Sequence, residues 1–122
     1  MPQEYYLDLI KARAAALDRP FSEGIDVTNG VTKPFIVERV WSGPAGNYQE
    51  QWSIRSGKRN VVYSYPGQLI FVRGMQSATT LIDEVNVPVR LAPGSYQLVF
   101  VVEGRFMGSV DIEVAEAGSA AA

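Results

Sequence analysis

The stretch from Leu91 to Val114 constrains the fold most, because apolar and polar side chains alternate along two long runs separated by two residues. Alternation with a period of two is the pattern of antiparallel strands that bury one face. The inward set is Tyr96, Leu98, Phe100 and Val102 on the first run, and Phe106, Gly108, Val110, Ile112 and Val114 on the second. Glu103 and Gly104 lie between the runs, and glycine readily adopts the positive φ of a tight hairpin turn. The stretch therefore predicts a β-hairpin that needs further strands to pack against.

Earlier segments supply those strands. Runs rich in Val, Ile, Thr and aromatic residues are bounded by Gly, Pro, Asn and Ser, and they predict strands over 25–27, 34–41, 48–54, 60–65, 69–72 and 79–89. Pro88 places the last of these at a sheet edge, because proline cannot donate a ladder hydrogen bond. With the hairpin, the chain has seven or eight expected strands spaced by about 8 to 12 residues, which is typical of a sandwich or barrel. A length of 122 residues suits one domain.

Residues 1–20 are predicted to contain the single helix, over 4–17. This segment is rich in alanine, carries acids early and bases late, and is followed by Pro20. Its apolar stripe consists of Tyr6, Leu9, Ile10 and Leu17. We expect the helix to pack on a sandwich formed by residues 21–115, with docking on another subunit as the alternative, and residues 116–122 to form a flexible tail.

The run Leu91-x-Pro93-Gly94-x-Tyr96-x-Leu98, with the hairpin that follows, resembles the terminal hairpin of bacterial immunoglobulin-like and fibronectin type III-like domains. The resemblance implies a mainly β, immunoglobulin-like antiparallel sandwich, here with one N-terminal helix. It also implies a structural corner at Pro93, Gly94 and Tyr96, in which the tyrosine hydroxyl returns to upstream backbone. The chain departs from antibody domains in lacking a cysteine pair. Such sandwiches host many unrelated functions, so the resemblance implies no activity.

Several chemistries are excluded by composition. The chain has no histidine and no cysteine, which removes imidazole acid-base catalysis, Ser-His and Cys-His nucleophiles, and zinc sites of the Cys/His type. We therefore expect neither an enzyme nor a cofactor. The net charge of −2 provides no global attraction to nucleic acid or anionic lipid. No signal peptide or long apolar run is present, so the expected location is cytoplasmic, with a phage or virion component left open.

A protein interface is the expected functional feature. If the inward set fills the core, Val99 and Val101 face the other way, and Met107 lies beside them. An apolar strip on a sheet needs a cover and often marks an interface. The candidate interface is therefore Val99, Val101 and Met107 together with Tyr6, Leu9 and Ile10, closed either by the helix or by another chain. This pattern predicts a non-catalytic protein-binding or self-associating module, such as a small structural subunit of a larger particle.

Two other functions follow from other residues. A barrel interior lined by Trp41, Tyr48 and Trp52 would hold a small apolar ligand. A basic patch of Arg55, Lys58, Arg59 and Arg73, near Tyr63, Tyr65 and Phe71, has the composition of a single-stranded nucleic-acid site. Bases in a turn between strands are usually solvated surface, and the chain as a whole is acidic, so we do not expect nucleic-acid binding.

Three carboxylates stand out by position. Asp111 and Glu113 lie two residues apart on one strand face, a spacing that could serve glycoside hydrolysis, but we expect an outward polar face instead. Glu50 falls in the inward register of its strand. Because burying an unpaired charge is costly, we expect Glu50 at the rim of the sheet, with pairing to a base such as Arg39 as the alternative.

Overall fold

The computed structural model describes residues 7–57 and 60–117, and this part of the chain contains ten strands and no helix. The strands are β1 (Asp8–Ala16), β2 (Ile25–Thr28), β3 (Val31–Thr32), β4 (Phe35–Ser42), β5 (Gly46–Ser56), β6 (Asn60–Ser64), β7 (Gln68–Val72), β8 (Thr79–Val85), β9 (Gly94–Val102) and β10 (Arg105–Glu116). The prediction of a mainly β protein is confirmed. In the described residues no helix is long and apolar enough to cross a membrane.

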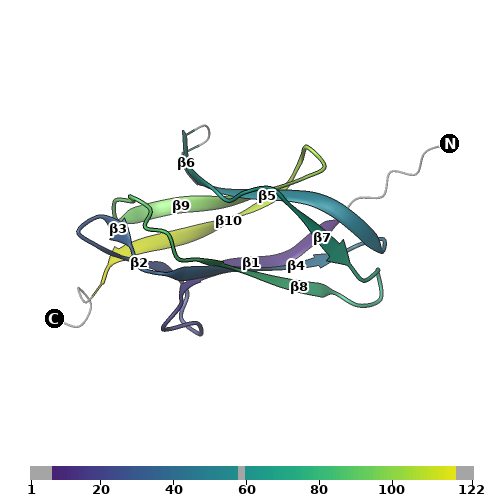
Figure 1. Cartoon of the computed structure of the whole chain (residues 1–122), viewed down its shortest axis with the longest axis horizontal. Coiled ribbons are helices and arrows are strands. Elements are labelled where there is room, and N and C mark those ends of the chain that lie inside the picture. The colour runs from purple at the N-terminus through teal and green to yellow at the C-terminus, as the bar shows by residue number, and fades with distance from the viewer. Residues whose placement is uncertain (1–6, 58–59, 118–122) are drawn as a thin grey trace.

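The strands form two sheets that lie over each other as layers (Figure 1). The smaller sheet has the order β1-β4-β8. The larger has the order β3-β2-β10-β9-β5-β6, in which β6 pairs with the second half of β5, and β7 pairs with the first half of β5. Pairing is antiparallel except between β2 and β10. The core lies between the layers, where the ring of Trp41 on β4 meets that of Phe100 on β9 edge to face, with centroids 6.0 Å apart.

The predicted N-terminal helix is wrong, because residues 8–16 form strand β1. Lys11 and Arg13 point outward. The alanines that alternate with them point inward: Ala14 belongs to the core, Ala12 packs against it and Ala16 is buried. Small inward side chains allow β1 to pair with β4 as an edge strand packed close to β10. Alanine favours a helix by less than ~1 kcal/mol per residue, and this preference is outweighed by the pairing with β4 and by core burial.

The β9–β10 hairpin forms as the alternation predicts, with one correction. Glu103 and Gly104 have φ angles of 51° and 78°, as a two-residue hairpin turn requires. A bulge between Phe106 and Gly108 then reverses the facing of the side chains. Phe106 is therefore 66% exposed rather than inward with Val110.

The chain crosses between the sheets after β1. Gly24, with a φ of 114°, donates its amide to the carbonyl of Ala14 at 2.8 Å and leads into β2, which lies beside β10. At the other end, Glu116 still belongs to β10, and the amide of Ala117 donates to Val27 at 2.7 Å. The first two residues of the predicted tail, 116 and 117, are therefore hydrogen-bonded to or part of the larger sheet, and residues 118–122 lie outside the described part.

Candidate interaction surface

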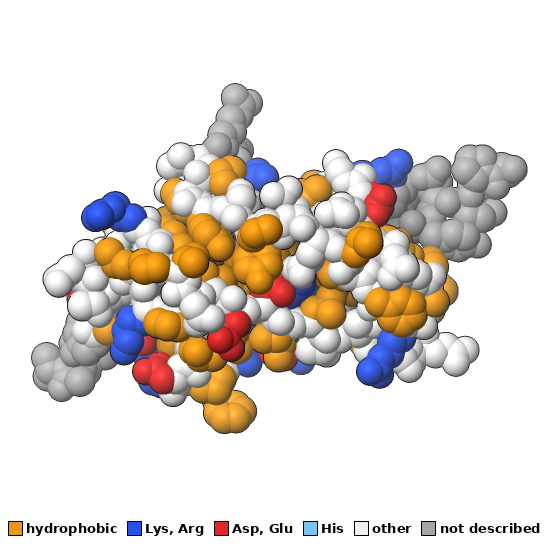
Figure 2. All heavy atoms as spheres, viewed as in Figure 1, with side chains coloured by type: hydrophobic (Ala, Val, Ile, Leu, Met, Phe, Trp, Pro, Cys, Tyr) orange, Lys and Arg blue, Asp and Glu red, His pale blue; other side chains and the backbone are white. Residues whose placement is uncertain are grey.

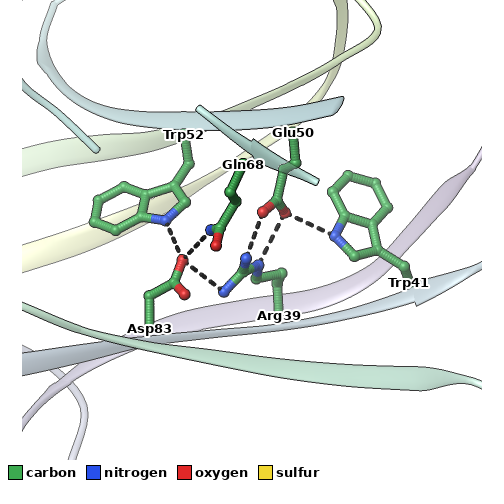
Figure 3. Close-up of polar contacts among 6 residues, drawn as sticks. All are labelled: Arg39, Trp41, Glu50, Trp52, Gln68 and Asp83. Carbon is green, nitrogen blue, oxygen red and sulfur yellow. Dashed lines mark hydrogen bonds and ion pairs between the residues drawn. The ribbon is translucent and has the colours of Figure 1, made fainter. Parts of the chain in front are cut away.

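Glu50 does not lie at the rim of its sheet. Its carboxylate is fully buried and is paired with Arg39, whose exposure is 1%. Arg39 donates from Nε to Glu50 Oε2 at 2.9 Å and contacts Oε1 through Nη2. Trp41 Nε1 donates to the same Oε2 at 2.9 Å, and Figure 3 shows these groups converging between the layers. The expected rim position is wrong, and the alternative, an ion pair with Arg39, is the arrangement found.

Asp83 on β8 extends this cluster toward solvent. Its Oδ2 accepts hydrogen bonds from Trp52 Nε1 and Gln68 Nε2, both at 2.8 Å, and lies 3.0 Å from Arg39 Nη1 (Figure 3). The last contact is an ion pair without hydrogen-bond geometry. Because β4 and β8 belong to one layer and β5 and β7 to the other, the cluster joins the two sheets. Its central charges are buried and paired, so its role is structural.

The interior aromatic rings are packed against protein. Trp52 is 1% exposed and stacks on Tyr65 with centroids 4.9 Å apart, and Tyr63 lies 5.9 Å away on the same ring. Burial raises the pKa of both tyrosines, and the nearby carboxylate of Asp83 adds to the increase. Trp41, with 0% exposure, is enclosed by Phe100 and Glu50. Protein side chains therefore pack against the rings of both Trp41 and Trp52.

Two tyrosines close corners at the starts of core strands. Tyr96 donates its hydroxyl to the carbonyl of Ala92 at 2.7 Å, which is the contact that the resemblance implies. Tyr48 makes the same contact with Pro44, also at 2.7 Å and also four residues upstream. Sequence reasoning missed the second corner. The signal is the shared Gly-x-Tyr: Gly94 and Gly46 both have positive φ, at 149° and 152°.

The five predicted interface residues that the structure describes do not form one surface. Val99 is 4% exposed on the outer side of the larger sheet, where it pairs with Ser53 and Ser109. Val101 is half-buried, and Met107 packs against the core. Leu9 is partly buried, packs against the core and lies close to Gly108. Ile10 is 57% exposed on β1, and Tyr6 lies outside the described residues.

The basic patch is not assembled by the described residues. Arg55 lies near the end of β5, whereas Arg73 follows β7, whose Val72 pairs with Gly46 at the start of β5. Nine residues of strand separate these positions, a distance of about 30 Å at ~3.4 Å per residue. Lys58 and Arg59 lie outside the described part of the chain.

The carboxylate pair on β10 faces solvent. Asp111 accepts a hydrogen bond from Gln97 at 3.4 Å, and Glu113 accepts one from the hydroxyl of Ser95 at 2.6 Å. All four side chains are exposed on the outer side of the larger sheet. Asp111 and Glu113 therefore belong to an exposed polar face of the sheet, as expected.

The surface instead presents large apolar side chains at several places. Figure 2 shows hydrophobic atoms in separate groups across one face, with charged side chains between them. The most exposed are Phe21 at 97%, Leu69 and Met75 at 69%, Phe106 at 66% and Phe71 at 59%. Phe21 lies on the connection between β1 and β2, which projects from the smaller sheet (Figure 1). Sequence reasoning missed it: the proline directly before Phe21 indicates a turn, but no alternation of side chains shows whether the ring is exposed.

The connection that carries Phe21 is held by hydrogen bonds to the backbone of the residues before and after it. Arg13 Nη1 donates to the carbonyl of Pro20 at 2.6 Å, and the amide of Ser22 donates to Arg19 at 3.0 Å. Arg19 also pairs with Asp26 at 2.5 Å, and this hydrogen bond raises the pKa of the arginine. Phe21 is therefore an exposed aromatic side chain on a segment whose backbone is fixed by its neighbours.

No family model matches this sequence, and no curated protein sequence matches it. Solved structures do resemble it. A DNA glycosylase for alkylpurines from Pseudomonas fluorescens, bound to DNA with an abasic-site analogue, matches 89% of this chain with a TM-score of 0.60 and 10% identity. A β-glucosidase from Listeria innocua, in complex with glucose, matches 92% with a TM-score of 0.54 and 12% identity. The chain spans only 30% and 16% of those proteins, and at this identity the likeness extends to the fold alone.

Proposed function

We propose that the chain is an immunoglobulin-like β-sandwich. In such domains, strands A, B and E share one sheet and strands C, F and G the other. The order β1-β4-β8 corresponds to A-B-E, and the order β10-β9-β5 corresponds to G-F-C. The tyrosine corner ahead of β9 lies where this correspondence places it, at the start of strand F. Strands β2 and β3, and the absence of cysteine from the sequence, are departures from the antibody pattern.

We further propose that this sandwich is a non-catalytic protein-binding or assembly module. The observation that carries the proposal is Phe21, which is 97% exposed on a segment pinned by hydrogen bonds. Burying such a side chain in a partner is worth about 1.5–3 kcal/mol. Because the segment is already ordered, little of that gain is lost to immobilising it. An aromatic anchor of this kind is typical of interface hot spots.

Two further observations support a module over an enzyme. The similar solved proteins contain this fold as a part of a much longer chain, so the fold occurs there beside other segments. The ionisable groups buried in the described part of the chain are each paired with an opposite charge: Arg39 with Glu50 inside the core, and Asp26 with Arg19. The apolar-ligand alternative is disfavoured, because both Trp41 and Trp52 are buried, pack against other rings and donate their indole N–H groups to carboxylates.

The test is affinity purification from native cells with the wild type, Phe21→Ser and the matched variant Phe71→Ser. We expect Phe21→Ser to retain its melting temperature, because the ring is almost fully exposed, but to lower partner recovery about 10-fold or more, as a loss of ~1.4 kcal/mol or more requires. Phe71→Ser should recover the partner as the wild type does. Equal recovery with all three proteins would rule out Phe21 as the anchor.

A further inference from the structure

Strand β8 is an open edge of the smaller sheet. Among the described residues its seven positions pair with β4 alone, in a register with no shift. Other outer strands carry irregularities: β1 has a bulge between Leu9 and Lys11, and the pairing of β6 with β5 shifts between Ile54 and Arg55. Native proteins usually protect edges with bulges, prolines or lysines, since a regular edge is a template for another strand. Between Thr79 and Val85 the β8 edge has no bulge, proline or lysine, and its inward-pointing charge, Asp83, is already engaged by the cluster between the layers.

The side chains of β8 fit an added strand. Thr80, Ile82 and Glu84 face outward and are exposed, and Ile82 reaches 57%. The inward side chains Leu81 and Asp83 belong to the core and to the buried cluster. An added strand would therefore use the free backbone groups of the edge and would cover Ile82, without disturbing the contacts that hold the layers together.

We propose that β8 pairs antiparallel with β8 of a second copy of this chain. The two smaller sheets then form one continuous sheet of six strands related by a two-fold axis. Pairing centred on Ile82 aligns all seven residues of each strand. It places Asp83 opposite Leu81, Glu84 opposite Thr80, and the two copies of Ile82 opposite each other.

Charge and length together select this register. In an antiparallel sheet, opposed residues share a face, so a symmetric register must centre on a residue. Centring on Asp83 would oppose two carboxylates, which is destabilising, and would leave two residues of each strand unpaired. Centring on Leu81 also shortens the ladder. The register centred on Ile82 keeps full length and opposes no like charges, and this self-complementarity is the reason for choosing a second copy over an unrelated strand.

The proposal goes beyond Phe21 and uses a different part of the molecule. The order β1-β4-β8 places the Phe21 connection, which follows β1, at the opposite edge of the sheet from β8. A seven-residue edge contact is smaller than a standard interface of ~1,600 Å², so the self-association is weak and is best detected by covalent trapping.

Because the chain has no cysteine, a single substitution reports the register. In Ile82→Cys the two sulfur-bearing residues face each other with Cα atoms about 4.5–5.5 Å apart, within the span of ~4.4–6.8 Å that a disulfide allows. In Thr80→Cys, on the same exposed face, the two copies are four residues out of register, about 14 Å apart. Val87→Cys replaces a side chain as exposed as Ile82, at 57%, but beyond the strand.

Under mild oxidation we expect Ile82→Cys to form the disulfide-linked dimer at least 10-fold faster than Thr80→Cys and Val87→Cys. Equal rates for the three variants, or fastest trapping of Thr80→Cys, would overturn the proposal. Uncrosslinked protein gives an independent reading. The wild type and Val87→Lys should show dimer by sedimentation equilibrium near 1 mM, whereas Ile82→Lys should remain monomeric. A monomeric wild type at this concentration would also overturn the proposed pairing of β8 strands. Phe21→Ser should dimerise normally, so failure here and failure of the proposed partner anchor remain distinguishable.

Discussion

Neutralising the buried carboxylate of Glu50 should strongly destabilise the protein, although Glu50→Gln replaces only one oxygen atom by an amino group. Glu50→Gln preserves the shape of the side chain but removes the charge that faces Arg39 in a fully buried site. The amide also places a donor nitrogen where the carboxylate accepted hydrogen bonds from the guanidinium or from Trp41. Breaking a buried ion pair from one side costs about 3–5 kcal/mol, because the remaining charge stays desolvated. Asp83, with Oδ2 3.0 Å from Arg39 Nη1, partly compensates, so the lower half of this range is expected.

The assay is urea denaturation followed by tryptophan fluorescence, with thermal melting as a second reading. Against a typical total stability of about 5–15 kcal/mol, a loss of ~3 kcal/mol is large and lowers the melting temperature by roughly 10 °C or more. Glu84→Gln is the matched control, since Glu84 is exposed on β8 and should change stability by no more than about 0.5 kcal/mol.

A double-mutant cycle separates the pair from its surroundings. Arg39→Met leaves Glu50 buried without its base, and Arg39→Met/Glu50→Gln removes both charges. The double variant should be about 1–3 kcal/mol more stable than the sum of the two single effects predicts. A Glu50→Gln protein within ~1 kcal/mol of the wild type, or additive single effects, would refute the reasoning that these charges are paired in a site without solvent.

Three other changes test separate features. Tyr96→Phe removes the hydrogen bond to Ala92 and should cost about 0.5–1.5 kcal/mol in the same urea assay, and an unchanged midpoint would contradict a formed corner. Burial raises the pKa values of Tyr63 and Tyr65, so their contribution to stability is complete below the unfolded pKa of ~10 and is lost as pH rises through the folded values. Titration of the absorbance at 295 nm, compared between the wild type, Tyr63→Phe and Tyr65→Phe, measures these ionisations. Titration of both hydroxyls at the pKa of an unfolded tyrosine would contradict the expectation. Gly24→Ala should destabilise by about 1–3 kcal/mol, because its φ of 114° is strained for alanine and the new Cβ would meet the carbonyl of Glu113 at 3.3 Å; a thermal melt unchanged from the wild type would exclude that strain.

The strands that could be predicted from the sequence are those whose alternation is set by burial on one face. The runs around Trp52 and Leu98 show that period, whereas the run around Phe35 is apolar on both faces and is recognisable by its composition; each forms a strand within a few residues of the expected bounds. The strand predicted over 79–89 ends at Val85, so Pro88 lies beyond it rather than within it, although β8 is an edge strand as predicted. The terminal hairpin was predicted for the same reason, apart from the bulge beside Gly108.

The first strand could not be predicted in this way, because its inward side chains are alanines. Ala12, Ala14 and Ala16 favour a helix by intrinsic propensity, and only the pairing with β4 makes them a strand. The alternation of Lys11 and Arg13 with alanine was the available signal. With the helix absent from the described residues, the expected cover for Val99 is absent too, and Val99 is buried at 4% on a sheet face with no helix over it.

The candidate site was hidden from the sequence for a different reason. A buried carboxylate and its base are distant in sequence, so Glu50 was recognisable as an exception but its partner was not determined until β4 and β5 were placed in facing layers. Phe21 lies in a turn, where no periodicity distinguishes an exposed aromatic residue from a buried one. Exposure depends on which way the connection leaves the sheet, and that direction is set by contacts such as Arg13 with Pro20.

Photo-crosslinking in native cells tests most directly whether this β protein binds another protein through the connection between β1 and β2. A benzophenone amino acid replaces Phe21 in one protein and Phe71, a second exposed aromatic residue, in another. A discrete adduct of higher mass from position 21, absent from position 71, is the expected result. No adduct at position 21, or the same adducts from both positions, would contradict a binding role for Phe21.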